Sequence, residues 1–166
     1  MTLLKSFDNL EYSEAFESNK EAQNWLETNG RRFGQLINGQ FVSSKDSKLI
    51  ASLDPSNGEL LANIEVANSS QLDSAVKSAR KAQPAWEKLG GHERAKVLYA
   101  LARLIQKHSR LISVLESLDN GKPVAIAAGA DVALSSDIFR YMAGWATKIE
   151  GETIPISVPY TPGAQY

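Results

Sequence analysis

The pattern of apolar and polar positions predicts an amphipathic helix near the N-terminal end of the chain. Residues 13–29 carry apolar side chains at helical spacing, and Gly30 is expected to end the helix. Ser18 or Asn19 is a possible internal cap. The apolar face consists of Ala22, Trp25 and Leu26, which we expect to pack on the rest of the chain.

Alternating patterns then predict two β hairpins. Residues 35–42 form two short apolar runs around Asn38-Gly39, a dipeptide that supplies the positive φ values of a tight hairpin turn. Residues 49–66 form a second pair of runs around the turn sequence at 54–58, in which Pro55 fixes φ at the second position.

Helical spacing dominates the next part of the chain. Ser69 and Ser70 are the expected caps of a helix that ends at Pro84, with one face made of Leu72, Ala75, Val76 and Ala79. Two further helices are predicted at 92–108 and 109–120, the latter followed by Gly121 as a left-handed cap. Their apolar positions are Leu98, Leu101, Ala102 and Ile105 in the first, and Leu111, Ile112, Leu115 and Leu118 in the second.

A fourth helix and a β arm complete the pattern. The helix covers roughly residues 130–150, stops at Gly151, and has a predicted buried face of Ile138, Met142, Trp145 and Ile149. Residues 152–166 are strand-like, but the prolines at 155, 159 and 162 restrict them to a sheet edge or an extended arm. The fold class is therefore α/β, with two β hairpins, about four helices and a β arm, as expected for one lobe of a longer protein.

Composition narrows the classes of partner. The 166 residues are 43% hydrophobic and 22% charged, with a formal net charge of -1 and interleaved acids and bases. Because no basic stripe is present, we expect no nucleic-acid partner. Apolar runs are far shorter than the roughly 20 residues needed to cross a bilayer, and the first residues lack a signal-peptide core, so we expect a cytoplasmic protein without a membrane partner. The absence of cysteine excludes disulfides, thiolate metal ligands and a cysteine nucleophile within this chain.

The stretch Asp-Asn-Gly-Lys-Pro at 119–123 offers the most specific candidate chemistry. Gly121-Lys122 has the final pair of a phosphate loop but lacks the upstream glycine, the following Ser or Thr and a preceding strand. Helix termination is the better interpretation. Asp119 stands in the last helical turn, where the helix dipole disfavours an acid, so it is expected to have a cation partner, either a basic side chain or a metal ion.

Other candidates indicate structure rather than chemistry. His92 and His108 lie sixteen residues apart at opposite ends of one predicted helix, about 24 Å at 1.5 Å per residue, and cannot share a metal ion. Tyr141 and Trp145 fit a core better than a stacking platform. From these residues alone, the sequence indicates a fold and no catalytic site.

The order of these features resembles the N-terminal part of NAD(P)-dependent aldehyde dehydrogenases. The resemblance covers roughly residues 33–158 and rests on blocks such as "ESLDNGKP" and "FRYMAGWATKIEGETIP". Residues 7–33 look like the extra N-terminal segment of the long, two-module branch of that superfamily. Asp54-Pro55 stands where the family usually has Asn-Pro.

This resemblance implies three regions and one site. Residues 1–33 would be an N-terminal helical extension, 34–151 the N-terminal part of the coenzyme-binding domain, and 152–166 the start of an oligomerisation hairpin. It also implies a structural site for a monovalent cation, formed by the Asp119 carboxylate and the backbone of Ser52 and Leu53.

Family chemistry implies that this chain alone is inactive. In the family a cysteine thiolate attacks the aldehyde, an Asn and a backbone N–H stabilise the oxyanion, and a Glu activates water. All of these lie beyond this segment, so no catalytic or cofactor-binding residue is assigned. NAD or NADP would belong to the complete enzyme, and none is expected to bind this chain alone.

Two interpretations of the chain's role follow. In the first, the chain is the scaffold and assembly region of an aldehyde-oxidising enzyme. Its partner is then the remainder of the polypeptide, and the full-length enzyme forms a homo-oligomer. In the other, it is a non-catalytic truncated module that assembles with a full-length partner. In either case we expect the chain alone to leave apolar faces uncovered around Ile138, Met142 and Trp145 and along the arm at 152–158.

Overall fold

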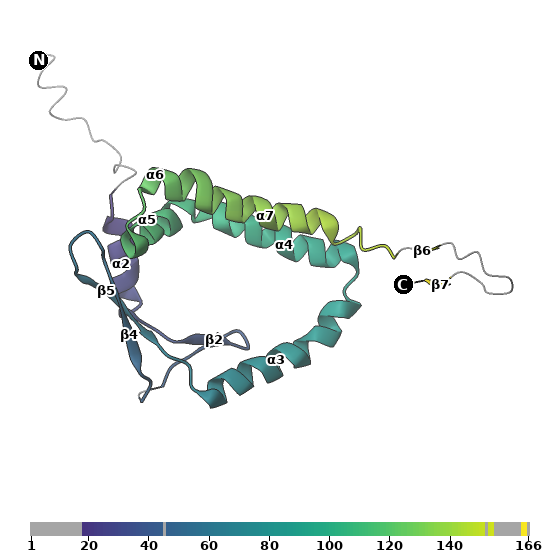
Figure 1. Cartoon of the computed structure of the whole chain (residues 1–166), viewed down its shortest axis with the longest axis horizontal. Helices are drawn as coiled ribbons and strands as arrows, with labels where there is room; N and C mark the ends of the chain where they lie inside the picture. The colour runs from purple at the N-terminus through teal and green to yellow at the C-terminus, as the bar shows by residue number, and fades with distance from the viewer. Residues whose placement is uncertain (1–17, 45, 152, 155–163, 166) are drawn as a thin grey trace, which may run out of the picture.

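The computed structural model describes residues 18–44, 46–151, 153–154 and 164–165, and it forms an open ring (Figure 1). Short strands and one helix make one side of the ring, and long helices make the others. In chain order the elements are α2 (Lys20–Thr28), β1 (Arg32–Phe33), β2 (Gln35–Ile37), β3 (Gln40–Val42), β4 (Leu49–Leu53), β5 (Leu60–Glu65), α3 (Ser69–Lys88), α4 (Gly91–Lys107), α5 (Ser109–Asn120), α6 (Val124–Ile126), the π-helix η1 (Ala127–Val132), α7 (Ala133–Trp145), β6 (Thr153–Ile154) and β7 (Ala164–Gln165).

Both predicted hairpins are confirmed. Strands β2 and β3 pair antiparallel around Asn38 and Gly39, whose φ values of 53° and 74° are those a tight hairpin turn needs. Strands β4 and β5 also pair antiparallel, with a bulge between Ser52 and Leu53. Strand β1 adds a parallel neighbour on the other side of β5, giving the order β1-β5-β4, which the sequence pattern did not predict.

The core under this sheet joins α2 and α5 to β5. Leu26 of α2 packs with Leu61 and Ala62 of β5, and partly buried Phe33, Leu115 and Leu118 surround them. Trp25 stacks on Phe33, with ring centroids 5.4 Å apart and an interplanar angle of 9°. The predicted apolar face of α2 is thus confirmed for Ala22 and Leu26, which are buried, while Trp25 remains partly exposed. The predicted helix residues 13–17 lie outside the described residues.

Arginine side chains attach α2 to its neighbours. Arg31, directly after the helix, donates to the carbonyl of Leu61 at 2.8 Å and to the Gln23 side chain at 2.7 Å. Arg110 of α5 donates to Glu21 at 2.6 Å near the start of α2. Asn19 stands at the N-cap position, but its side chain makes no capping hydrogen bond.

Helix α3 departs from the prediction at both ends. The cap is Asn68, which exchanges hydrogen bonds with Gln71 in a capping box, so the assignment of Ser69 and Ser70 as caps is wrong. The helix also continues through Pro84 to Lys88. Proline removes one amide donor and crowds the preceding turn, but the following residues can still form helical hydrogen bonds, so the helix is disturbed without ending there.

Helices α4 and α7 pack side by side along one side of the ring (Figure 1). Small residues lie between them: Ala95 and Ala102 of α4, and Ser136 and Ala143 of α7, are all buried. The Ser136 hydroxyl donates to the Ala102 carbonyl at 3.3 Å. The backbones of α4 and α7 therefore lie close together through small side chains, whereas the sequence pattern predicted a contact through large apolar side chains.

The prediction of the buried face of the last helix is wrong for this chain. Ile138, Met142, Trp145 and Ile149 are 48% to 79% exposed, because α4 covers the opposite, small-residue face. The expectation that the chain leaves this apolar face uncovered is confirmed. The same expectation for the arm at 152–158 falls on residues whose exposure the structure does not describe. The helix also starts earlier than predicted, since α6, η1 and α7 follow one another without a break from Val124 to Trp145, and it ends before Gly151.

At the C-terminal end, β6 pairs antiparallel with β7. Thr153 is opposite Gln165, and Ile154 is opposite Ala164. This pairing agrees with a strand that starts near residue 152; its role in oligomerisation remains a prediction.

Candidate functional site

The stretch that ends α5 is a helix terminus. Gly121 adopts a left-handed conformation with φ 75°, and its N–H donates to the Ser117 carbonyl at 2.9 Å. The Ser117 hydroxyl donates to the Lys122 carbonyl at 2.6 Å, and the Asn120 side chain accepts from the Lys122 N–H at 2.8 Å. These contacts satisfy backbone groups that the helix end leaves free, so the prediction of helix termination is confirmed.

Lys122 has acidic partners instead of a phosphate. Its ammonium group donates to Asp131 of η1 and lies 3.7 Å from Glu116. The hydrogen bond to Asp131, together with the charges of both acids, raises the pKa of Lys122 above its ordinary value. Its side chain therefore links the end of α5 to η1.

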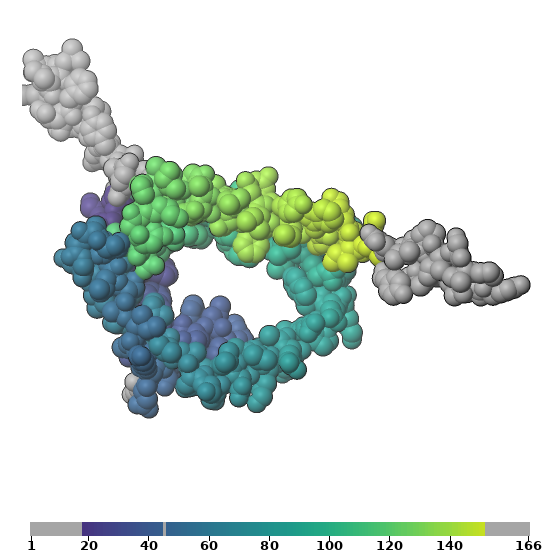
Figure 2. Space-filling view, in the orientation of Figure 1, coloured from purple at the N-terminus to yellow at the C-terminus, as the bar shows by residue number. Residues whose placement is uncertain are grey.

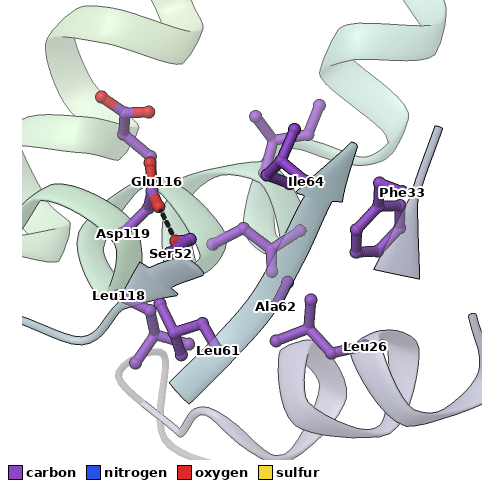
Figure 3. Close-up of a pocket in the computed structure, with 11 residues that line it drawn as sticks. Leu26, Phe33, Ser52, Leu61, Ala62, Ile64, Glu116, Leu118 and Asp119 are labelled. Atoms are coloured by element: carbon purple, nitrogen blue, oxygen red, sulfur yellow. Dashed lines mark hydrogen bonds between the residues drawn. The ribbon is translucent and has the colours of Figure 1, made fainter. Parts of the chain in front are cut away.

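Asp119 points from the last turn of α5 toward strand β4. The Ser52 hydroxyl donates to the Asp119 carboxylate, so two residues separated by 67 positions in the sequence are in direct contact (Figure 3). Pro55, in the turn after β4, lies close to the same helix end: a β-carbon added to Gly121 would lie 2.9 Å from its Cγ. The turn and the helix end are thus closely fitted.

The three residues predicted to hold a cation are brought together only in part. Ser52 reaches Asp119 through its hydroxyl, whereas the hypothesis requires backbone carbonyl oxygens. Leu53 follows Ser52 at the bulge, where the register of β4 against β5 shifts. The contact brings the Asp119 carboxylate to strand β4. Binding of a cation there stays a prediction.

A cavity of about 380 Å³ lies beside this contact, between the sheet and α2 and α5. Its walls are mainly aliphatic, and its polar residues are Ser52, Glu116 and Asp119 (Figure 3). The polar groups of the cavity are one hydroxyl and two carboxylates. Oxygen atoms of this kind suit a hard cation. Within the described part of the chain, this cavity included, no cluster of three or more His, Cys, Asp or Glu could hold a metal ion.

The structure also places the remaining candidates from the sequence. His92 and His108 are both exposed, at opposite ends of α4. Tyr141 and Trp145, expected in the core, are exposed, with their rings 6.1 Å apart and the Lys148 ammonium 5.7 Å from the Trp145 ring. The prediction that these two rings belong to the core is therefore wrong for this chain.

Glu65 is a buried acid that the sequence pattern did not identify. Its carboxylate accepts from the Arg32 guanidinium at 2.6 Å, from the Ser43 hydroxyl at 2.5 Å and from the Ser44 N–H at 2.9 Å. These hydrogen bonds, led by the one from Ser43, lower the pKa of Glu65 to about 2. The carboxylate joins β5 to β1 and to the end of β3. The sequence offers one signal for this buried ion pair: Glu65 is a charged residue at the end of an apolar strand, and a residue of opposite charge, Arg32, occurs much earlier in the chain.

Comparisons with known proteins agree on one family. The model of the aldehyde dehydrogenase family matches residues 41–164. Over 127 residues, the chain is 42% identical to the mitochondrial aldehyde dehydrogenase family 2 member B4 of Arabidopsis thaliana and 39% identical to the mitochondrial benzaldehyde dehydrogenase of Antirrhinum majus. Each match covers 75% of this chain and 24% of the relative, so the chain spans about a quarter of their length.

Solved structures give the same result. The aldehyde dehydrogenase from Bacillus cereus, in its NAD+ complex, superimposes with a TM-score of 0.75 at 36% identity, covering 90% of this chain and 29% of that protein. PnpE, in complex with nicotinamide adenine dinucleotide, superimposes with a TM-score of 0.71 at 38% identity, covering 75% of this chain and 26% of that protein. The ring of helices and short strands therefore has a close counterpart within larger proteins.

Proposed function

Because this chain belongs to the aldehyde dehydrogenase family, we propose that it is the N-terminal part of an enzyme that oxidises aldehydes to carboxylic acids with NAD or NADP. In this proposal it serves as scaffold and assembly region and contains none of the catalytic residues. The observation that carries the proposal is the match over 75% of this chain but only 24% of its relatives, together with the absence of cysteine.

The proposal assigns a role to each region. Residues 34–151 are the first part of the coenzyme-binding domain, residues 1–33 are an N-terminal extension, and residues 152–166 begin an oligomerisation hairpin. The antiparallel pairing of β6 with β7 supports a hairpin in the last region. The contacts of Arg31 and Arg110 support an extension that is docked on the domain, because they hold α2 against β5 and α5. The complete protein would be a cytoplasmic homo-oligomer.

An activity measurement tests this proposal directly. The purified chain, mixed with NAD or NADP and an aldehyde such as benzaldehyde, should produce no reduced cofactor above a blank, because it offers no thiol to attack the carbonyl. The same residues, replacing the matching N-terminal part of the Bacillus cereus enzyme, should give a fusion that reduces the cofactor. Turnover by the chain alone, or an inactive but folded fusion, would contradict the proposal.

The cation site forms a separate part of the proposal. We infer that Asp119 and the carbonyl oxygens of Ser52 and Leu53 hold a monovalent cation, supported by the contact between Ser52 and Asp119. A ligand that binds only the folded state raises stability. Sodium or potassium chloride should therefore raise the melting temperature relative to choline chloride at the same ionic strength.

Two variants make this measurement specific. Asp119→Asn should remove the difference between the salts, because it removes the charged ligand. Asp137→Asn is the matched control, since Asp137 is an exposed acid that accepts from Arg140 on its own helix at 3.0 Å. The same response to sodium and choline in the unmodified chain would exclude the site.

A further inference from the structure

The chain contains four Asn-Gly pairs, and in each of them the glycine has a positive φ. The pairs are Asn29-Gly30, Asn38-Gly39, Asn57-Gly58 and Asn120-Gly121, with glycine φ values of 68°, 74°, 77° and 75° in that order. Both residues of every pair are exposed. An asparagine before glycine can lose its side-chain amide, because glycine has no β-carbon to keep its nitrogen away from the preceding side chain. Sequence and exposure alone do not rank these four sites.

The hydrogen bonds of the glycine N–H groups separate one pair from the others. Three of these groups donate to a backbone carbonyl: Gly30 to Glu27 at 2.8 Å, Gly58 to Asp54 at 2.7 Å and Gly121 to Ser117 at 2.9 Å. The Gly39 N–H makes no hydrogen bond within the described residues, since the tight turn pairs Ile37 with Gln40 and leaves Gly39 outside the ladder. Its nitrogen can therefore lose a proton without first breaking a hydrogen bond.

The Asn38 side chain is also placed for this reaction. The Ser78 hydroxyl of α3 donates to Asn38 Oδ1 at 3.2 Å. Attack on Cγ of Asn38 places negative charge on this oxygen, and a hydroxyl donor beside it stabilises that charge. The amide groups of two other asparagines are held by the adjoining helix: Asn29 donates to the Trp25 carbonyl at 2.7 Å, and Asn120 donates to the Glu116 carboxylate at 2.5 Å.

We propose that Asn38 is a site of spontaneous deamidation, with water as the second reactant. The Gly39 nitrogen gives its proton to water and attacks Asn38 Cγ, so that a new C–N bond forms, the Cγ–Nδ2 bond breaks and ammonia leaves. The product is a cyclic imide. Water then adds to one of its two carbonyl groups and opens the ring to aspartate or to isoaspartate. Nothing is oxidised or reduced, and the net change is amide plus water to carboxylate plus ammonium.

The modification would alter the contact between the β2–β3 hairpin and α3. The hairpin lies against α3 and borders the opening in the molecule (Figures 1 and 2). Either product adds one negative charge there, which takes the formal net charge from -1 to -2. Isoaspartate also adds a methylene group to the main chain, inside a turn whose length sets the pairing of Ile37 with Gln40. This inference does not depend on the proposed function.

The test follows all four asparagines in one sample. The chain is incubated in neutral buffer with and without urea, and peptide mapping by mass spectrometry measures the conversion of each asparagine to the acid; enzymatic methylation identifies isoaspartate. In the folded chain Asn38 should react about two- to tenfold faster than each of the other three, the factor expected from one hydrogen bond of the glycine N–H. In urea the four rates should become similar, because these hydrogen bonds are lost.

Two variants give a second measurement. Asn38→Asp and Asn57→Asp each remove one amide from an exposed turn, and neither acid can release ammonia at that position. Ammonia release by the folded chain should fall much more in the first variant than in the second. Equal rates at the four sites of the folded chain, or a faster reaction at another site, would overturn the proposal. The same excess at Asn38 in urea would assign it to the local sequence and would also overturn the role of the turn.

Discussion

Replacement of Gly121 by alanine should weaken the fold at the end of α5 for two separable reasons. The backbone at Gly121 has φ 75°, a conformation that costs an L-residue about 1–2 kcal/mol. A β-carbon there would also lie 2.9 Å from Cγ of Pro55, whereas carbon atoms in contact prefer about 3.5–4.0 Å. Pro55 belongs to a turn in which the Ser56 N–H donates to the Asp54 carboxylate at 2.8 Å and the Gly58 N–H donates to the Asp54 carbonyl at 2.7 Å, so it can move only by disturbing these hydrogen bonds.

The expected magnitude follows from these two contributions. Crowding in a closely packed region typically costs about 1–3 kcal/mol. Added to the backbone cost, this gives a loss of about 2–5 kcal/mol in the free energy of unfolding for Gly121→Ala. Gly30→Ala is the matched control: Gly30 also follows a helix and has φ 68°, but no atom lies within 4 Å of its added β-carbon. Its loss should be only about 1–2 kcal/mol.

Urea unfolding followed by circular dichroism measures both losses. The double variant Gly121→Ala with Pro55→Ala should recover at least about 1 kcal/mol relative to the sum of the single variants, because removing the ring relieves the crowding. Equal losses at Gly121 and Gly30, with no coupling to Pro55, would refute the close fit of the turn against α5. The position of Asp119 beside Ser52 would then need another cause.

Three further predictions concern single contacts. The pKa of Glu65 is lowered from 4.5 to about 2, so its contribution to stability is present above about pH 5 and is lost as the pH falls toward 2. Glu65→Gln should remove this part of the acid dependence, and an acid-unfolding curve that does not change in the variant would contradict the prediction. Arg110→Ala should increase protease cleavage near α2, but it should change global stability by only about 0.2–1 kcal/mol, because the ion pair with Glu21 is partly exposed. Arg140→Ala breaks an ion pair within α7 and is the control; equal cleavage in this variant would contradict a role of Arg110 in docking α2 on α5. Ala102→Leu should lower the free energy of unfolding by about 1–3 kcal/mol, because the larger side chain separates α4 from α7. Ala100 is exposed, so Ala100→Leu should cause no loss, and calorimetry that finds both variants equal would contradict the close contact between the helices.

Local signals in the sequence were sufficient for the elements whose conformation depends on neighbouring residues. Asn38-Gly39 requires positive φ wherever it occurs in a hairpin, and Gly121 provides the same freedom at the end of α5. The periodic apolar positions of α4 and α5 likewise predict helices regardless of what covers them. The family resemblance rested on specific blocks of sequence such as "ESLDNGKP", and the comparisons confirmed it.

Only the tertiary structure decided which surfaces meet. Ser136 and Ala143, not Ile138 and Trp145, face α4, because α4 presents small alanines that allow the two backbones to approach closely. A hydrophobic pattern on one helix cannot reveal the shape of its neighbour.

The contact between Ser52 and Asp119 has the same origin, since it joins residues 67 positions apart across a strand and a helix end. The parallel pairing of β1 with β5 and the buried pair of Arg32 with Glu65 also depend on partners distant in the sequence. Periodicity and turn residues fix local backbone conformation, whereas these contacts arise only after the elements have packed against one another. For this reason the sequence by itself determined the two hairpins and the presence of the main helices, whereas the tertiary structure determined the place of β1, the faces that meet and the site.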